Sequence, residues 1–287
     1  MEPRISVVIN TLNEENNLPY ALRSVLPWAD EIVVVDMHSK DRTVEMARQF
    51  GAKVCLHPGP GFEYPPREFA VAQASGEWVL VLDADEVVPI GLSLELRSIA
   101  RSGNVDVVPL PRLNYILGAP MKYSGCGPDQ DFQYRFFKKN SMQCSSLAHR
   151  DFAPATGARV SRLPYRGNNA LVHFAYLDAA QWVEKMNRYT SIDAQQRFER
   201  REHASSFKAL IHTMGMFLWM YIRRQGYRDG WRGFYYSALS AFYRLVTLAK
   251  LQGLERIGAR ARVGEIYRHD AERLLDEYGK ARTAVKI

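Results

Sequence analysis

The chain has 287 residues, 47% of them hydrophobic and 11% aromatic, a composition that can bury a large core and that excludes intrinsic disorder. Its formal net charge of +7 indicates an anionic partner, which nucleic acid, a phosphate-bearing ligand or an acidic membrane surface would each satisfy. The three cysteines form no CxxC pair and are odd in number, which argues against a disulfide framework and favours a reducing compartment.

Strands and helices alternate through roughly the first ninety residues. Short apolar runs rich in β-branched residues predict strands at 5–10, 31–36, 52–56 and 78–82. Apolar residues at helical spacing predict helices between them, the first closing at Pro27 and the second beginning near Asp41 and stopping at Gly51. This order predicts an α/β fold in which right-handed crossovers join parallel strands and helices cover the faces of the sheet.

Polar clusters follow three of these strands at the ends where they stop. They read "TLNEE" after the first strand, "DMHSKD" after the second and "DADE" after the fourth. In open parallel sheets the ligand crevice lies beyond the carboxyl ends of the strands, so these clusters mark the expected site. Neither GxGxxG nor GxxxxGK[ST] follows the first strand, which argues against a dinucleotide-dependent dehydrogenase and a P-loop enzyme.

The acidic "DADE" cluster ends a strand that is apolar enough to be buried on both faces. Asp83 and Asp85 lie on one face if the backbone stays extended, or fan out if a turn begins at Ala84. In either geometry the two carboxylates repel each other and favour a cation between them. Their oxygens suit Mg²⁺ or Mn²⁺, with diphosphate oxygens completing the shell. The alternative is that they cap the next helix, but their place beside two other polar clusters favours the metal site.

Three segments together resemble the nucleotide-sugar half of the family 2 glycosyltransferases, which have the GT-A fold: "ISVVINTLNEENNL", "EIVVVDMHSKDRT" and "ASGEWVLVLDADE". The resemblance implies a mostly parallel sheet flanked by helices over residues 1–180 and a helical C-terminal region over 181–287. It also implies a site for a nucleoside diphosphate sugar and a divalent metal, Mn²⁺ or Mg²⁺. The residues that it assigns to the donor are Thr11, Asn13, Glu14 and Asp36 for the base and ribose, Arg67 near the nucleotide, and Asp83 and Ala84 near the ribose or metal, with Asp85 as a metal ligand.

The later chain is similar to the subgroup that includes the lipopolysaccharide core glucosyltransferases, through "DFQYRFFKKN", "AHRDF" and "LVHFAYLDAAQWVEKMNRYTSIDA". This similarity implies a glycan or glycolipid acceptor. Arg135 is a candidate phosphate contact, whereas Lys138 and Lys139 are more typical of an exposed basic edge. For His173 two roles stay open: a further metal ligand, or a buried histidine held by hydrogen bonds.

Family 2 enzymes invert the anomeric centre, which implies a base beside the acceptor hydroxyl, and a carboxylate is the expected base. The subgroup's "VHE" aligns with His149 and Arg150, so arginine stands in place of the glutamate. Arginine does not deprotonate in proteins and is excluded as the base. Asp151, one place later, is the predicted base, with Asp131 as the second choice.

Two apolar stretches in the C-terminal third, 209–222 and 233–249, are too short or too interrupted to span a bilayer, which takes about twenty apolar residues. Between them "RRQGYRDGWR" gathers arginines, and aromatic residues cluster there: Trp219, Tyr221, Tyr227, Trp231, Tyr235 and Tyr236. This pattern favours a hairpin lying on an anionic membrane surface. A helical pair packed on the catalytic domain, or a dimer interface, is the alternative.

The N-terminus "MEPRISVVIN" lacks a basic region and a long apolar run, so we expect a cytoplasmic protein, peripheral on the cytoplasmic face of the inner membrane. Nucleic-acid binding is not expected, because the arginines lie beside apolar helices and not along a polar aromatic platform. Two rival functions remain. A nucleotidyltransferase would usually bring a glycine- and lysine-rich loop after the first strand, which "TLNEENNL" lacks. A non-catalytic nucleotide-sugar-binding scaffold is kept open by Arg150.

Overall fold

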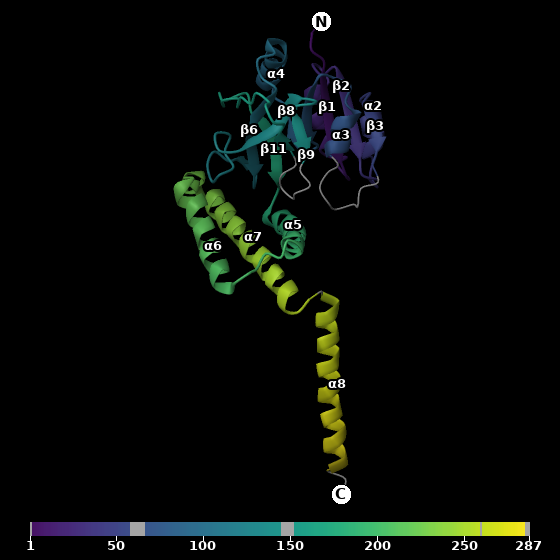
Figure 1. The fold of residues 1–287 in the computed structure, drawn as a ribbon, viewed down its shortest axis with the longest axis vertical. Coiled ribbons are helices and arrows are strands. Elements are labelled where there is room, and N and C mark those ends of the chain that lie inside the picture. Colours follow the sequence, from purple (N-terminus) through teal and green to yellow (C-terminus); the bar gives the residue numbers. More distant parts are fainter. Residues whose placement is uncertain (1, 58–66, 145–151, 259, 285–287) are drawn as a thin grey trace. The chain divides into compact units, whose positions relative to one another are not determined.

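The computed structural model describes residues 2–57, 67–144, 152–258 and 260–284 (Figure 1). Its strands are β1 (Ile5–Thr11), β2 (Glu31–Asp36), β3 (Lys53–Leu56), β4 (Trp78–Asp83), β5 (Glu86–Val87), β6 (Val107–Ile116), β7 (Ala119–Pro120), β8 (Phe132–Lys138), β9 (Met142–Cys144), β10 (Phe152–Pro154) and β11 (Leu171–Tyr176). Its helices are α1 (Leu18–Val25), α2 (Thr43–Gln49), α3 (Arg67–Gln73), α4 (Ile90–Ser102), α5 (Ala179–Glu199), α6 (Ser206–Leu218), α7 (Gly230–Arg256) and α8 (Arg260–Ala284), with a π-helical turn at Trp219–Arg223 and a 3₁₀ turn at Gly226–Asp229.

The main sheet has the strand order β3-β2-β1-β4-β8-β6-β11-β5, with β7 added to β6. The strands predicted from the sequence, β1 to β4, are all parallel, and β8 then enters antiparallel to β4 and to β6. The chain runs outward from β1 to β3 and returns to β4 on the other side of β1. The winding direction therefore reverses between β1 and β4, where a ligand crevice is expected.

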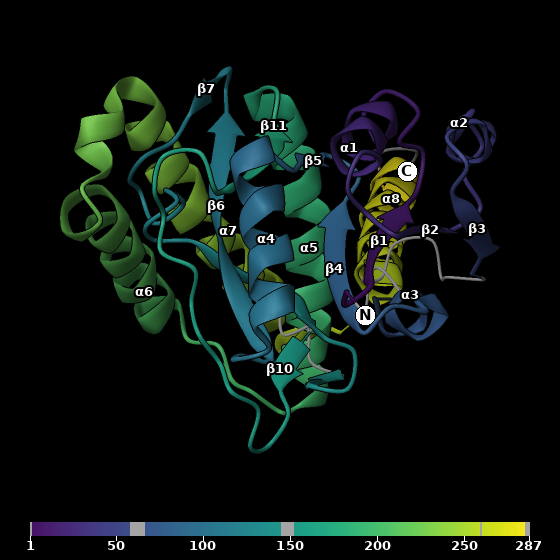
Figure 2. The ribbon, with the colours of Figure 1, turned by 90° about the horizontal axis from the view of Figure 1, so that it is seen from above.

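Helices pack on both faces of the sheet (Figure 2). The first face of β1 buries Ile5, Val7 and Ile9 against α1, α2 and α4, because alternate residues of a strand point to the same side. Val8 points to the other face, with Ala70 of α3. The predicted α/β class, with its helix-flanked sheet and helical C-terminal part, is confirmed.

The structure divides into two compact units, Met1–Val183 with Leu218–Ser237, and Glu184–Phe217 with Ala238–Ile287. The second unit is helical. Within it the segment before α6 is tied to the end of α7, since Glu255 accepts hydrogen bonds from His203 and from the backbone of Ala204. No helix in the described part of the chain has the length and hydropathy of a membrane span.

The segment Leu218–Ser237 belongs to the first unit, where one of its predicted membrane-facing aromatics points inward. Tyr236 packs against a small core formed by Ile116, Met121, Cys126 and Ala175. Burial raises the pKa of its hydroxyl well above the ordinary value. The prediction that Tyr236 lies at a membrane boundary is wrong, because its ring packs against this small core and does not face solvent or lipid.

Candidate functional site

The ends of β1 and β2 are joined by a hydrogen bond between two of the predicted donor-site residues. The hydroxyl of Thr11 donates to Asp36 Oδ2 at 3.0 Å, as expected from their pairing in the parallel register. Asp36 is fully buried, and its carboxylate also accepts from the backbone and the hydroxyl of Ser39, at 2.9 and 2.5 Å. Thr11, Asp36 and Ser39 therefore belong to one hydrogen-bond network at the carboxyl ends of β1 and β2.

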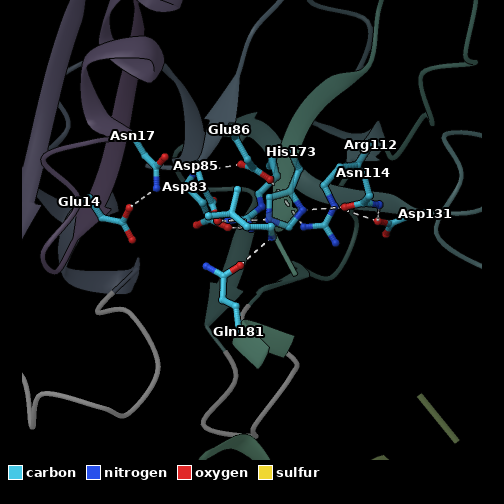
Figure 3. Close-up of polar contacts among 12 residues, drawn as sticks. Glu14, Asn17, Asp83, Asp85, Glu86, Arg112, Asn114, Asp131, His173 and Gln181 are labelled. Carbon is cyan, nitrogen blue, oxygen red and sulfur yellow. Dashed lines mark hydrogen bonds and ion pairs between the residues drawn. The ribbon is translucent and has the colours of Figure 1, made fainter. Parts of the chain in front are cut away.

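Asn13 and Glu14 follow β1 and bind the loop after β2. Asn13 has a positive φ of 57°, a conformation that asparagine tolerates better than most residues, and its side chain accepts from the backbone of Lys40 at 2.8 Å. Glu14 donates its backbone N–H to Thr43 Oγ1 at 2.8 Å and accepts from Asn17 Nδ2 at 2.8 Å (Figure 3). These loops are thus held together at the carboxyl ends of β1 and β2.

A turn at Ala84 and Asp85 separates the two aspartates that the sequence places two residues apart. Asp83 ends β4 and contacts Arg67 of α3 at 2.9 Å and Arg135 of β8 at 2.5 Å. Burial opposes ionisation of Asp83, but the charges of Arg135 and Arg67 outweigh it and hold the pKa of that carboxyl below its usual range. Of the two geometries left open by the sequence, the structure has the turn that fans the carboxylates out.

Glu86 and Arg112 extend this cluster. The side chain of Glu86 is fully buried, and its Oε2 accepts from the backbone N–H of Asp83 at 2.9 Å. Its other oxygen lies 3.6 Å from Arg112 of β6, which also donates to Asp131 at 2.8 Å. Burial disfavours the charge on Arg112, but Asp131 and Glu86 outweigh that effect and raise its pKa above the ordinary value.

His173 lies on β11, in register with Asn114 of β6 on one side and Glu86 of β5 on the other. Asn114 Nδ2 lies within hydrogen-bond distance of two acceptors, the carbonyl of Cys126 at 2.8 Å and Asp131 Oδ2 at 2.9 Å. Two acceptors on that side identify it as the NH₂ end of the amide, so Oδ1 faces the imidazole. His173 Nδ1, 2.6 Å from Oδ1, is then the protonated nitrogen that donates to Asn114.

The remaining nitrogen of His173 faces Asp85. Its Nε2 lies 3.5 Å from Asp85 Oδ2 (Figure 3). In the neutral imidazole this nitrogen carries a lone pair, so two electron-pair donors face each other and require a cation, either a proton or a metal ion. Imidazole and carboxylate together form a donor set that could hold a divalent ion such as Mn²⁺, so the chemistry of Asp85 and His173 fits such a group. Among the described residues no group of three His, Cys, Asp or Glu side chains gathers around one point.

Charge across the cluster also favours a cation. Arg67, Arg112 and Arg135 are matched by four carboxylates, those of Asp83, Asp85, Glu86 and Asp131. Three positive charges against four negative ones leave one negative charge uncompensated while His173 is neutral. Burial of such a charge is costly unless it is paired.

Of the two predicted general bases, Asp131 lies among the described residues and Asp151 does not. Asp131 accepts from Arg112, from Asn114 and from Gln133 Nε2, so both of its oxygens are engaged. Asp151, with His149 and Arg150, lies outside the described residues.

Sequence reasoning missed Arg112, Asn114 and the part played by Glu86. The signal was present in "PLPRLNYIL", where two polar residues two positions apart interrupt an apolar strand and therefore share one face of it. Arg112 and Asn114 lie outside the segments that resemble the family. Only their alternation with apolar residues along the strand indicated that both side chains point to one face of the sheet.

Comparisons with known proteins give the family of the chain. The profile described as "Glycosyl transferase family 2" matches residues 6–146. A protein of Rickettsia typhi named as an uncharacterized glycosyltransferase is 30% identical over 266 residues, which make up 88% of this chain and 87% of the relative. The lipopolysaccharide core biosynthesis glycosyltransferase LpsC of Rhizobium meliloti is 25% identical over 271 residues, 92% of this chain and 98% of LpsC.

Solved structures are similar over smaller parts of the chain. S. aureus TarS is 19% identical with a TM-score of 0.42, over 66% of this chain and 39% of TarS. Glucosyl-3-phosphoglycerate synthase from Mycobacterium tuberculosis, in complex with Mn²⁺, uridine diphosphate and glucosyl-3-phosphoglycerate, is 26% identical with a TM-score of 0.33, over 39% of this chain and 44% of that one. The Rickettsia relative and LpsC match a larger share of this chain, 88% and 92%, than the two solved structures do.

Proposed function

Because the chain belongs to glycosyltransferase family 2, we propose that it moves a sugar from a nucleoside diphosphate sugar to a hydroxyl of a lipid-linked or envelope glycan, with inversion at the anomeric carbon. In this reaction the acceptor oxygen forms a bond to the anomeric carbon, the bond from that carbon to the diphosphate oxygen breaks, and the nucleoside diphosphate leaves. The proton of the acceptor hydroxyl passes to a base.

The observation that carries the proposal is that His173 Nε2 lies 3.5 Å from Asp85 Oδ2 while the other ring nitrogen of His173 lies 2.6 Å from Asn114 Oδ1. Asp85 and His173 would hold a divalent metal, Mn²⁺ or Mg²⁺. When bound, such an ion supplies positive charge that stabilises the departing diphosphate. Asp83 was also predicted as a metal or ribose contact. Its oxygens are both engaged by Arg67 and Arg135, which favours a role in holding those guanidiniums.

Arg67 and Arg135 are the proposed protein groups beside the diphosphate. Both guanidiniums contact the single carboxylate of Asp83, so they bring two positive charges to this end of the cluster. Their side chains are only 12% and 5% exposed, which keeps water from screening that charge. Thr11, Asn13, Glu14 and Asp36 remain the proposed residues around the base and ribose.

Asp151 is the proposed base. The engagement of Asp131 by three hydrogen-bond donors supports this order of preference, because donors that stabilise the charged carboxylate make it a weaker base. Asp131 is better suited to hold Asn114 and Arg112 in place. For Asp151 the support is its position in the sequence, directly after the segment similar to "VHE".

The proposed acceptor class rests on the relative LpsC, which is named for lipopolysaccharide core biosynthesis. A lipid-borne acceptor would bring the enzyme to an anionic membrane surface, and we propose a peripheral protein on the cytoplasmic face.

The test is a thermal-unfolding panel of nucleoside diphosphates and their sugars, each with Mn²⁺, with Mg²⁺ and with a chelator. We expect one uridine or guanosine diphosphate series to raise the unfolding midpoint. At a free ligand concentration of about 100 times Kd, the folded state should be stabilised by about 2.7 kcal/mol. The chelator and Asp85→Asn should abolish the effect, while Asp129→Asn, at an exposed residue, should retain it. A flat panel on folded protein would contradict the donor site.

Turnover separates the enzyme from its rivals. Metal-dependent release of nucleoside diphosphate from a nucleotide sugar, lost in Asp85→Asn, is the expected result. Release of pyrophosphate from a nucleoside triphosphate and a sugar phosphate would identify a nucleotidyltransferase. Nucleotide-sugar binding without turnover in the presence of membrane glycolipids would identify a scaffold.

A further inference from the structure

The segment Leu218–Ser237 exposes large apolar and aromatic side chains although it belongs to the sheet-containing unit. Ile222 is 59% exposed, and Tyr227 and Trp231 are each 54% exposed. The others exposed in this segment are Leu218, Trp219, Phe234 and Tyr235. We call these side chains, with the arginines among them, the aromatic–arginine surface. Clustered exposed apolar side chains mark an interaction site more often than scattered ones do.

This surface is held rigidly by the domain beneath it. Asp229 accepts hydrogen bonds from the backbone N–H groups of Lys122 and Tyr123, at 3.0 and 3.1 Å, and from Ser124 Oγ at 2.9 Å. Gly226 and Gly233 meet so closely that a Cβ on Gly233 would lie 1.9 Å from the carbonyl oxygen of Gly226. The exposure is therefore a property of a folded turn and not of a fraying end.

The charges of the surface are almost all positive. The segment carries Arg223, Arg224, Arg228 and Arg232, and its one acidic residue is Asp229, whose carboxylate is taken up by the bonds just described. Three of the guanidiniums lie over rings: Arg224 is 4.6 Å from the centre of Trp219, Arg232 4.5 Å from that of Trp231 and Arg228 4.3 Å from that of Tyr123. Such pairs place an apolar body beside a charged head, as side chains at a membrane boundary do.

We propose that the aromatic–arginine surface docks on an anionic lipid bilayer, with the rings and Ile222 in the headgroup layer and the arginines on lipid phosphates. This inference deepens the proposed function, on which it rests for the membrane-borne nature of the acceptor. Tryptophan and tyrosine favour the boundary between water and hydrocarbon, and arginines near an anionic surface add electrostatic attraction.

Two other partners fit the same side chains less well. A twofold interface with a second copy would set one positively charged surface against another, since the same patch faces itself across the axis. Single-stranded nucleic acid would use the rings and the arginines, but Ile222 offers no face on which a base can stack, and it is the most exposed apolar side chain of the segment.

The test is co-sedimentation of the full chain with vesicles of phosphatidylcholine alone and of phosphatidylcholine mixed equally with phosphatidylglycerol, without nucleotide or metal. Three variants are compared with the unchanged chain. The double variant Arg223→Glu with Arg228→Glu reverses two exposed charges, and Ile222→Ser with Trp231→Ser removes apolar surface. Arg23→Glu with Arg48→Glu, on exposed positions of α1 and α2, is the matched control for charge.

We expect binding to the mixed vesicles that weakens with added salt, and at least about 25-fold weaker binding for the Arg223 and Arg228 variant, since each arginine contributes about fivefold. The Ile222 and Trp231 variant should lose about tenfold, and the control should bind as the unchanged chain does. Equal binding to both kinds of vesicle would overturn the proposal, and so would normal binding by the Arg223 and Arg228 variant and by the Ile222 and Trp231 variant. So would a dimer in light scattering that the same variants dissociate.

The vesicle test and the nucleotide-binding test can fail independently of each other. Nucleotide-dependent stabilisation of the charge-reversed variant should match that of the unchanged chain. A protein that binds donor but ignores anionic vesicles contradicts this inference alone, and one that binds vesicles but no nucleotide contradicts the proposed function alone.

Discussion

Nδ1 of His173 lies 2.6 Å from Oδ1 of Asn114, and this contact decides which nitrogen of the imidazole is left to face Asp85. Asn114 is itself oriented by Asp131 and the carbonyl of Cys126, which accept from its NH₂ group. The chain of contacts runs from a carboxylate through an amide to the imidazole, an arrangement that commonly fixes the tautomer of a metal-binding histidine.

Asn114→Ala should therefore weaken Mn²⁺ binding by about 10- to 100-fold, because loss of an outer partner frees the ring to change orientation and tautomer. The measurement is titration of free Mn²⁺ by electron paramagnetic resonance with diphosphate nucleotide present. Asn104→Ala, at an exposed asparagine, is the control and should leave binding unchanged. Unaltered Mn²⁺ affinity in Asn114→Ala would show that the amide has no part in the metal site.

Asp83 and Asp85 should differ in what their loss costs. Asp83→Ala leaves the largely buried guanidiniums of Arg67 and Arg135 without the carboxylate between them, and should destabilise the fold by about 3–5 kcal/mol. Asp85→Ala removes only the contact to His173 and should cost about 1 kcal/mol or less, while abolishing the metal dependence of nucleotide binding. Urea unfolding of both variants checks this. Equal destabilisation would contradict the separate roles.

Asp106 should contribute to a loss of stability in acid. The hydrogen bonds from Arg159 lower the pKa of its carboxyl below the ordinary value. Stability from such a group is present above the unfolded pKa of about 3.9 and is lost as the pH falls through the folded pKa. The unfolding midpoint of Asp106→Asn should lie below that of the unchanged chain at neutral pH, and the two should converge below about pH 4.

Asp129→Asn, at an exposed aspartate, is the matched control for the change of charge, and its unfolding midpoint at neutral pH should equal that of the unchanged chain. A gap between Asp106→Asn and the unchanged chain that persists undiminished into acid would mean that the Asp106 carboxylate acts through packing and not through its charge.

Gly233→Ala should loosen the turn that carries the aromatic–arginine surface, because the added Cβ would lie 1.9 Å from the carbonyl oxygen of Gly226. We expect a loss of about 1–3 kcal/mol in urea unfolding. Gly215→Ala, in α6, has nothing within 4 Å of the new Cβ and should be neutral or stabilise by about 1 kcal/mol, since alanine favours a helix interior. If both variants behave alike, the close packing of Gly226 on Gly233 is not a constraint.

Much of the sheet followed from the sequence by itself. Local periodicity predicted β1 to β4, the helices between them and the edge where polar clusters meet, because parallel strands joined by helices leave few arrangements open. Thr11 and Asp36 were expected at one edge, and they are hydrogen-bonded there. Family resemblance added the family itself, glycosyltransferase family 2, which the matched profile and the Rickettsia relative show.

Tertiary structure alone decided how the carboxylates are used. The spacing of Asp83 and Asp85 left both a shared face and a fanned turn open, and the turn at Ala84 sends one to a pair of arginines and the other to His173. Asn114 and His173 are 59 residues apart and meet because β11 pairs with β6, a contact between distant segments. Local patterns specify which residues form a strand, whereas the pairing of distant strands depends on packing across the whole sheet, and the tautomer of His173 is set only there.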